Sequence, residues 1–408
     1  MQTSAPSPAV IDRSPPWEIL WVFLRLGLTS FGGPVAHLGY FRTEFVERRR
    51  WMDERSYADL VALCQFLPGP ASSQVGIAVG MARGGWLGSL AAWAGFTLPS
   101  ALVLIVFALA LTRHGEWADS GALHGLKVVA VAVVAQAVWG MAKSLCPDRP
   151  RAALAIGAAL LTLLLPSAFA QVGAIVVCGL VGRALLELPG QQAVEHRAYG
   201  VSRRAGASAL ALFTLLLLGL PLLAATTSSP IMTTLDAFYR AGALVFGGGH
   251  VVLPLLQSAV VPSGAVDSAQ FLAGYGAAQA VPGPLFTFAA YLGAVMQPTV
   301  AGIGGWAGGV ACLLAIFLPA WLLVVGALPF WDSLRQRPTV QSALAGINAG
   351  VVGILLAALY DPVWTSAIRS RADFALALAA FGLLVTARLS PLFVVALSGA
   401  AGWAMSTM

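Results

Sequence analysis

The chain contains 408 residues, of which 58% are hydrophobic and 10% charged, and its formal net charge is +6. Soluble domains carry about 25% charged residues, so this composition excludes a water-soluble globule and, with it, a soluble nucleic-acid-binding domain. The charge comes from 21 arginines and two lysines, most of them in a few short loops. Such loops are typical of membrane proteins, where Lys and Arg set the topology. The sequence therefore predicts an all-α integral membrane protein.

About 13 hydrophobic segments follow one another along the chain, and each is a candidate to enter or cross a bilayer. Six lie in the first half, at about 17–40, 57–82, 86–112, 124–145, 151–166 and 168–186. Six counterparts lie at about 235–256, 270–296, 305–330, 342–360, 372–387 and 390–406, and one extra segment lies at about 206–226. We therefore expect a first repeat in 1–186, a cytoplasmic linker with one extra helix in 187–233, and a second repeat in 234–408. Because the extra segment reverses the direction of entry, the second repeat should be inverted relative to the first.

The distribution of arginine supports this topology. The loop from 41 to 56 contains five arginines, whereas its counterpart from 257 to 270 contains neither Lys nor Arg. Cytoplasmic loops collect basic residues, so the two loops should lie on opposite sides of the membrane. The first loop reaches the cytoplasm only if the first two segments re-enter at internal breaks instead of spanning. We therefore favour paired, broken, re-entrant segments, which are tolerated where protein or a watery cavity surrounds them.

The same interrupted motif occurs in both halves, about 215 residues apart. An arginine, a Phe-Gly-Gly break and a Pro-Gly-Pro break stand in this order at Arg25, Gly32, Gly33, Pro68, Gly69 and Pro70, and again at Arg240, Gly247, Gly248, Pro282, Gly283 and Pro284. Paired, interrupted hydrophobic segments in two halves indicate the binding site of a secondary transporter.

The breaks are candidate anion sites. Pro34, Pro70 and Pro284 each fit the first position of a new helix, whose free N–H groups and dipole bind anions. Hydroxyl donors follow the second break of each half, at Ser72, Ser73 and Thr287. The alternative is that Pro-Gly-Pro only kinks a helix and that these hydroxyls bond to local carbonyls.

Arg25 and Arg240 precede the first glycine of their breaks by seven residues, about two helical turns on the same face. An intramembrane arginine normally faces a bundle interior or a cavity, so both could hold an anionic substrate. Alternatively, they snorkel to lipid headgroups or pair with Glu18 or Asp236.

Two further residue types remain open as site residues. The amides of Gln65 and Gln279, one turn before their breaks, could donate to an oxyanion or cap carbonyls freed by the prolines. His250 could couple transport to protons or simply pack.

At these residues the chain resembles the chromate ion transporter family of bacterial inner-membrane proteins. The resemblance rests on Phe-Gly-Gly-Pro at 31–34, Phe-Leu-Pro-Gly-Pro at 66–70, Gly-Gly-Trp at 84–86 and their second-half echoes. It implies the duplicated two-domain form and export of chromate, driven by the membrane or proton gradient, with sulfate as a further ligand. The second copy departs from the first, because Gly249 replaces Pro34 and the basic loop is lost.

Proteins of other classes share some of these features. A transporter of another dianion, such as sulfate, or a passive anion channel would also use arginines and helix ends. An intramembrane enzyme is disfavoured because no catalytic set is evident in the segments. We expect no cofactor, no metal and no nucleic acid, with membrane lipid and chromate as partners. A homodimer is compatible with the sequence.

Overall fold

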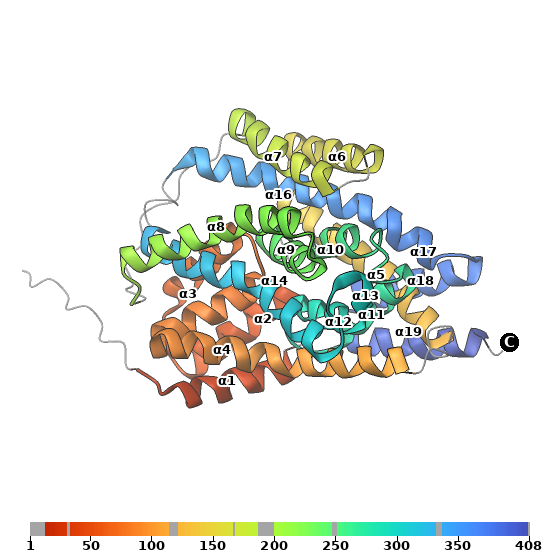
Figure 1. Ribbon diagram of the computed structural model, residues 1–408, viewed down its shortest axis with the longest axis horizontal. Coiled ribbons are helices and arrows are strands. Elements are labelled where there is room, and N and C mark those ends of the chain that lie inside the picture. Colours follow the sequence, from red (N-terminus) through yellow and green to blue (C-terminus); the bar gives the residue numbers. More distant parts are fainter. Residues whose placement is uncertain are drawn as a thin grey trace, which may run out of the picture.

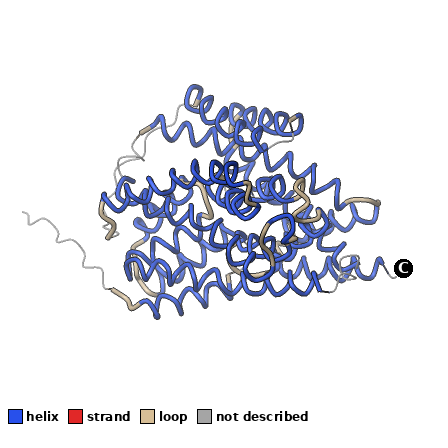
Figure 2. The backbone as a smooth tube through the Cα atoms, in the orientation of Figure 1, coloured by secondary structure: helices blue, strands red, loops and turns tan. Residues whose placement is uncertain are grey.

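The computed structural model describes residues 13–30, 33–113, 121–165, 168–186, 200–246, 251–331 and 337–406. These parts are helical, and Figure 2 draws no strand in them. The first-half helices are α1 (Pro16–Thr29), α2 (Gly33–Arg42), the π-helix η1 (Thr43–Arg48), α3 (Glu54–Phe66), α4 (Ala71–Arg113), α5 (Gly121–Leu145), α6 (Arg149–Leu164) and α7 (Ala168–Leu185). The helix α8 (Arg203–Thr227) follows the linker.

The second-half helices are α9 (Pro230–Ala243), α10 (Val252–Val260), α11 (Ser268–Ala280), η4 (Leu285–Thr287), α12 (Phe288–Val295), α13 (Pro298–Ala301), α14 (Gly305–Ala327), η5 (Leu328–Phe330), α16 (Pro338–Ala358), η6 (Leu359–Trp364), α17 (Thr365–Ala367), α18 (Arg371–Val385) and α19 (Pro391–Ser406). The prediction of an all-helical membrane protein is confirmed for the described residues. Five helices there are long and apolar enough to cross a bilayer, those beginning at Ala71, His124, Arg203, Gly305 and Pro338.

The first hydrophobic segment forms a helical hairpin. With 14 residues, α1 is about 21 Å long, too short to cross the hydrocarbon core of about 30 Å. The chain then returns along α1 through α2 and η1. Glu18, near the start of α1, pairs with Arg49 after η1 at 3.2 Å, and the ring centroid of Phe23 lies 5.7 Å from that of Phe41 and 5.2 Å from that of Phe45. The end of α1 and the start of α2 therefore form the tip of the hairpin.

The second segment forms another hairpin, between α3 and the first part of α4. Trp51, just before α3, lies beneath the guanidinium of Arg83, whose Cζ is 5.1 Å from the ring centroid. The range of α4 includes Gly85, but the backbone at this residue is non-helical, with φ 61° and ψ −149°. Two helical stretches therefore meet there. Gly80 and Gly88 touch across this turn, so the chain reverses once more and the remainder of α4 runs the length of the molecule (Figure 1). The Gly-Gly-Trp motif is thus a tight turn.

The second half repeats this arrangement. Its α9 packs on α10, and α11 and α12 flank the second Pro-Gly-Pro motif. The backbone N–H of Gln297 donates to the carbonyl of Ala265 at 3.2 Å. Counted from the Pro-Gly-Pro motifs, these two residues occupy the positions of Arg83 and Trp51. The hairpin closes at the same place in both halves.

The last helices of each half are exchanged. In Figure 1, α6 and α7 lie on α16, and α19 lies with α5 at the other end of the bundle. A Cβ on Gly346 of α16 would clash with the carbonyl of Cys178 in α7, and a Cβ on Gly125 of α5 would clash with the carbonyl of Ser398 in α19. Small residues permit such close helix approach in membranes. Each half therefore completes its packing with helices from the other.

Apolar side chains also cover the outside of the molecule. The most hydrophobic stretch of α8 is only 6% buried, and Leu215, Leu218 and Leu222 are exposed. An exposed apolar surface of this size indicates contact with a partner or a membrane. Together with its length, this surface fits a helix in contact with lipid.

Candidate functional site

The tips of the hairpins meet in reciprocal pairs, each joining one half to the other. The N–H of Gly69, in the first Pro-Gly-Pro break, donates to the carbonyl of Val245 at 2.6 Å. The N–H of Gly283, in the second Pro-Gly-Pro break, donates to the carbonyl of Ser30 at 3.0 Å. Ser30 and Val245 each stand just before a Phe-Gly-Gly motif, so the two bonds are equivalent when the halves are exchanged. Reciprocal contacts of this kind are the signature of two-fold symmetry.

Both Pro-Gly-Pro tips require glycine. Gly69 has φ +122° and Gly283 has φ +103°, which is backbone that a side chain rarely adopts. A Cβ on Gly69 would lie 2.9 Å from Nε2 of Gln74 and 3.1 Å from Cβ of Ala320, and a Cβ on Gly283 would lie 2.9 Å from Oγ of Ser100. The glycines thus let the tips dock against the helices that follow Pro99 and Pro319. Gly33 also has a positive φ, +77°, so its backbone favours glycine too. A Cβ on Gly33 would meet nothing within 4 Å.

The first Pro-Gly-Pro tip leads directly into a long helix. The first intrahelical bond of α4 runs from the N–H of Gln74 to the carbonyl of Pro70 at 3.0 Å. Pro70 is therefore the N-cap, and the helix begins at Ala71, one residue later than we predicted. The N–H groups of Ala71, Ser72 and Ser73 have no preceding helical carbonyl to bind. Ser72 and Ser73 are buried, and Oγ of Ser72 lies 3.3 Å from Nδ1 of His37. These N–H groups and hydroxyls therefore lie together at one helix start, and their binding of an anion stays a prediction.

The second Pro-Gly-Pro tip is built differently. Pro284 precedes the short 3-10 helix η4, and the buried hydroxyl of Thr287 donates to the carbonyl of Pro284 at 2.8 Å. For Thr287, the local bond that we kept as an alternative is therefore the one observed. The two halves do not offer equal sets of donors.

The two motif arginines have different surroundings. Arg25 is exposed and lines a cavity of about 700 Å³, so of the two surroundings that we expected, the cavity and not the bundle interior is observed. Tyr40, Arg42, Glu44 and Arg48 line the same cavity. Among the residues that the structure describes, no carboxylate pairs with Arg25, which leaves its charge available to an anion.

Arg240 is neutralised within its own helix. Its guanidinium pairs with the buried Asp236 at 2.5 Å, one turn earlier in α9. For Arg240, the alternative of pairing with Asp236 is the one observed, because residues four apart meet on one helix face. Arg240 holds Asp236 rather than offering a free charge.

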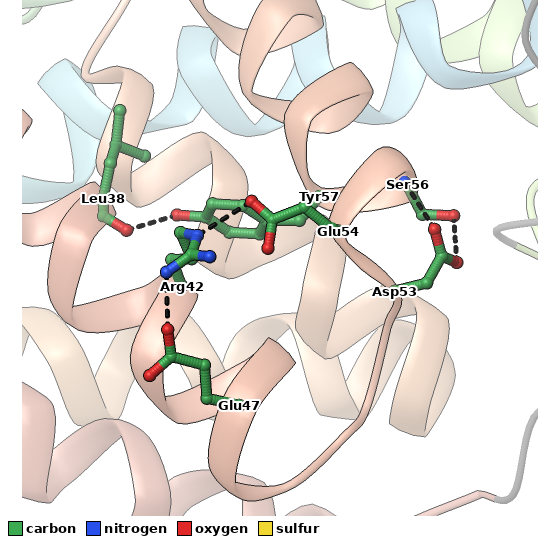
Figure 3. Close-up of polar contacts among 7 residues, drawn as sticks. All are labelled: Leu38, Arg42, Glu47, Asp53, Glu54, Ser56 and Tyr57. Atoms are coloured by element: carbon green, nitrogen blue, oxygen red, sulfur yellow. Dashed lines mark hydrogen bonds and ion pairs between the residues drawn. The ribbon is translucent and has the colours of Figure 1, made fainter.

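Arg42, another arginine of the cavity, is held by two carboxylates, as Figure 3 shows. Arg42 donates to Glu54 at 2.8 Å and also to Glu47, and the hydrogen bond and charge of Glu54 raise the pKa of Arg42. Tyr57 donates to the carbonyl of Leu38. These contacts tie α2 to the start of α3. Because the ion pairs are exposed to solvent, they contribute little to stability.

The remaining predicted residues are only partly brought together. Pro68 and Pro282 flank the tip glycines, and the carbonyl of Pro68 accepts from Nε2 of Gln74 at 2.8 Å. Gln65 is exposed, whereas Nε2 of Gln279 is buried without a hydrogen-bond partner. The predictions for Gly32, Gly247, Gly248 and His250 concern residues outside the described parts of the chain.

Sequence reasoning did not assign several buried polar residues near the tips. Ser30, His37, Thr97 and Ser100 are all buried, and they come from three separate stretches of the chain. Ser30 directly precedes the Phe-Gly-Gly motif, and Ser100 directly follows Pro99. Their adjacency to the breaks is the signal that could have found them.

An all-helical bundle with broken hairpins meeting between its halves and a lipid-compatible exterior defines a multi-pass membrane transport protein. The family model described as Chromate transporter matches residues 17–186 and again residues 232–403. The chain belongs to the chromate transporter family, in its duplicated form, and this family consists of non-enzymatic transporters.

Named relatives agree with this assignment. The chain is 30% identical to the chromate transport protein of Pseudomonas aeruginosa, over 93% of this chain and 90% of the relative. It is 26% identical to the chromate transport protein of Cupriavidus metallidurans, over 84% and 81%, and 25% identical to a probable chromate transport protein of Synechococcus elongatus, over 84% and 83%. No solved structure matches the chain.

Proposed function

We propose that the chain exports chromate across the bacterial inner membrane by alternating access, driven by the membrane or proton gradient. The observation that carries this proposal is the reciprocal pair of tip contacts, Gly69 with Val245 and Gly283 with Ser30. Such contacts place the interrupted backbone of both halves side by side, which is where secondary transporters bind their substrates.

The same contacts support an inverted repeat of 1–186 and 234–408. Two halves related by a two-fold axis in the membrane plane have opposite topologies, and the exchange of α6 and α7 with α18 and α19 fits such an axis. The arginines of the 41–56 loop and their absence from 257–270 agree with loops on opposite sides.

The hairpins support re-entry of the first two segments. Glu18 meets Arg49 and Trp51 meets Arg83, so each hairpin begins and ends at the same end of the molecule. This arrangement keeps the arginine-rich loop on the side where the chain enters. The hairpin tips then lie inside the protein, where irregular backbone is tolerated.

Transport requires the tip contacts to open alternately. The bond between Gly283 and Ser30 and the bond between Gly69 and Val245 are separate closures, one on each side of the two-fold axis. In this mechanism an anion reaches the site when one closure opens and leaves when the other does. Arg25, exposed in its cavity, attracts the anion on the side of the arginine-rich loop.

Transport by everted membrane vesicles tests the proposal. We expect vesicles containing the protein to accumulate labelled chromate, sulfate to compete, and a protonophore to abolish accumulation. Accumulation of sulfate without chromate would make the protein a transporter of a different dianion. Chromate flux that only follows its own gradient, with a leak conductance in liposomes, would make it a passive channel.

A further inference from the structure

Four buried polar side chains of the first half, near the tips, each have one atom without a hydrogen-bond partner. They are Ser30, His37, Ser73 and Thr97, each at most 3% exposed. The atoms without partners are Oγ of Ser30, Nε2 of His37, Oγ of Ser73 and Oγ1 of Thr97. Burying such groups unsatisfied is unfavourable, and native proteins leave few of them.

Contacts around the Gly283 tip connect these residues. The carbonyl of Ser30 accepts from the N–H of Gly283 at 3.0 Å, and the Ser30 backbone also interacts with the imidazole of His37. Nδ1 of His37 lies 3.3 Å from Oγ of Ser72, at the start of α4 and next to Ser73.

The same imidazole reaches the turn of α4 that carries Thr97. The ring centroid of His37 lies 5.3 Å from that of Phe96, edge to face. A Cβ on Gly283 would lie 3.2 Å from the carbonyl of Phe96. The three stretches of the first half thus converge on the second-half tip.

In the described part of the second half, the positions equivalent to this cluster are mostly apolar. Counted from the repeated motifs, Val245 stands where the first half has Ser30, Val252 where it has His37, and Phe317 where it has Thr97. Thr287 replaces Ser73, and its hydroxyl is already bonded to the carbonyl of Pro284. The fold therefore packs this region with apolar residues in one half, so polar residues in the other are not needed for packing.

We propose that the protein binds one oxyanion per chain, at a first-half site formed by Ser30, His37, Ser73 and Thr97, and that the equivalent place in the second half is a packed copy that binds none. This inference rests on the proposed transport of an oxyanion and assigns its site. The start of α4 adds N–H donors and a favourable dipole, and the hydroxyls add neutral donors.

The chemistry of the cluster suits a tetrahedral dianion. An oxyanion without protons only accepts hydrogen bonds, and hydroxyl groups can turn to donate. If Ser72 donates to Nδ1 of His37, then Nε2 carries the imidazole proton and donates it to the anion. The imidazole stays neutral in this arrangement, and the anion gains a donor without a fixed countercharge.

Chromate binding by the purified, detergent-solubilised full-length protein tests the inference. The site variants are Ser30→Val and His37→Val, which introduce the residues found at 245 and 252. Each should weaken chromate binding about 10-fold or more, as expected for hydrogen bonds to a charged group. The matched control, Val252→Ala, alters packing at the equivalent second-half position and should leave affinity unchanged.

Two further measurements keep the outcome interpretable. His37→Gln retains an N–H donor and should bind more tightly than His37→Val, and thermal unfolding without ligand shows which variants are folded. Titration of the wild type should give one chromate per chain, with sulfate competing. Wild-type affinity in folded Ser30→Val and His37→Val, or two chromates per chain, would overturn the assigned site while leaving transport intact. If the wild type binds and transports neither anion, the proposed function itself fails.

Discussion

Substitution of the tip glycines tests whether backbone N–H groups coordinate the anion. At φ +122° in Gly69 and +103° in Gly283, alanine costs about 1–2 kcal/mol because its Cβ crowds the backbone. The new Cβ also meets Gln74 or Ser100 at 2.9 Å, and overpacking costs about 1–3 kcal/mol more. The tip must shift to relieve this strain.

We therefore expect Gly69→Ala and Gly283→Ala to weaken chromate binding by at least about 2 kcal/mol, or about 30-fold. Removing one hydroxyl in Ser73→Ala should cost less, about 1.5 kcal/mol or about 10-fold, as for a single hydrogen bond to a charged group. The assay is equilibrium chromate binding by purified variants, with protein level and thermal unfolding measured in parallel. Gly140→Ala is the matched control, because a Cβ there meets nothing within 4 Å.

The expected ranking is therefore glycine first and hydroxyl second, with similar protein levels. If Gly69→Ala and Gly283→Ala bind chromate normally while Ser73→Ala does not, the anion is held by side chains. The reasoning from helix termini would then be wrong, although the protein could still transport chromate.

Three further predictions concern topology and the motif arginines. Cysteines introduced at the exposed Thr43 and Ser263, in a cysteine-free background, should react differently with an impermeant thiol reagent in intact cells. Labelling of both cysteines from one face would contradict the inverted-repeat proposal. Arg25→Lys should reduce transport at unchanged protein level, because the lysine ammonium lacks the planar guanidinium that binds oxyanions with two hydrogen bonds. Unchanged transport kinetics in Arg25→Ala would show that the side chain only snorkels. Arg240→Ala should lower protein stability by about 1–3 kcal/mol, because it leaves the buried Asp236 without its partner. Adding Asp236→Asn should restore much of this loss in thermal unfolding. Equal stability of the single and double variants would show that the pair is not a structural unit.

The sequence predicted the features that depend on local pattern. Hydrophobic segments, paired glycine and proline breaks, and their ordered recurrence indicated a duplicated membrane transporter of the chromate family before any contact was known. The breaks at Gly69 and Gly283 were located from residue type alone, because positive φ and a missing backbone N–H are properties of glycine and proline.

Only the tertiary structure decided which breaks meet. The pairing of Gly69 with Val245 and of Gly283 with Ser30, the exchange of terminal helices between the halves, and the convergence of His37 with Ser72 join residues far apart in the chain. Local periodicity carries no information about such pairings, because any apolar helix face can pack on many others. The sequence placed both arginines in one role, and the structure separated them, since Asp236 neutralises Arg240 while Arg25 lines an open cavity. Repetition of a motif thus specified equivalent backbone, and the packed neighbours of each copy decided its chemistry.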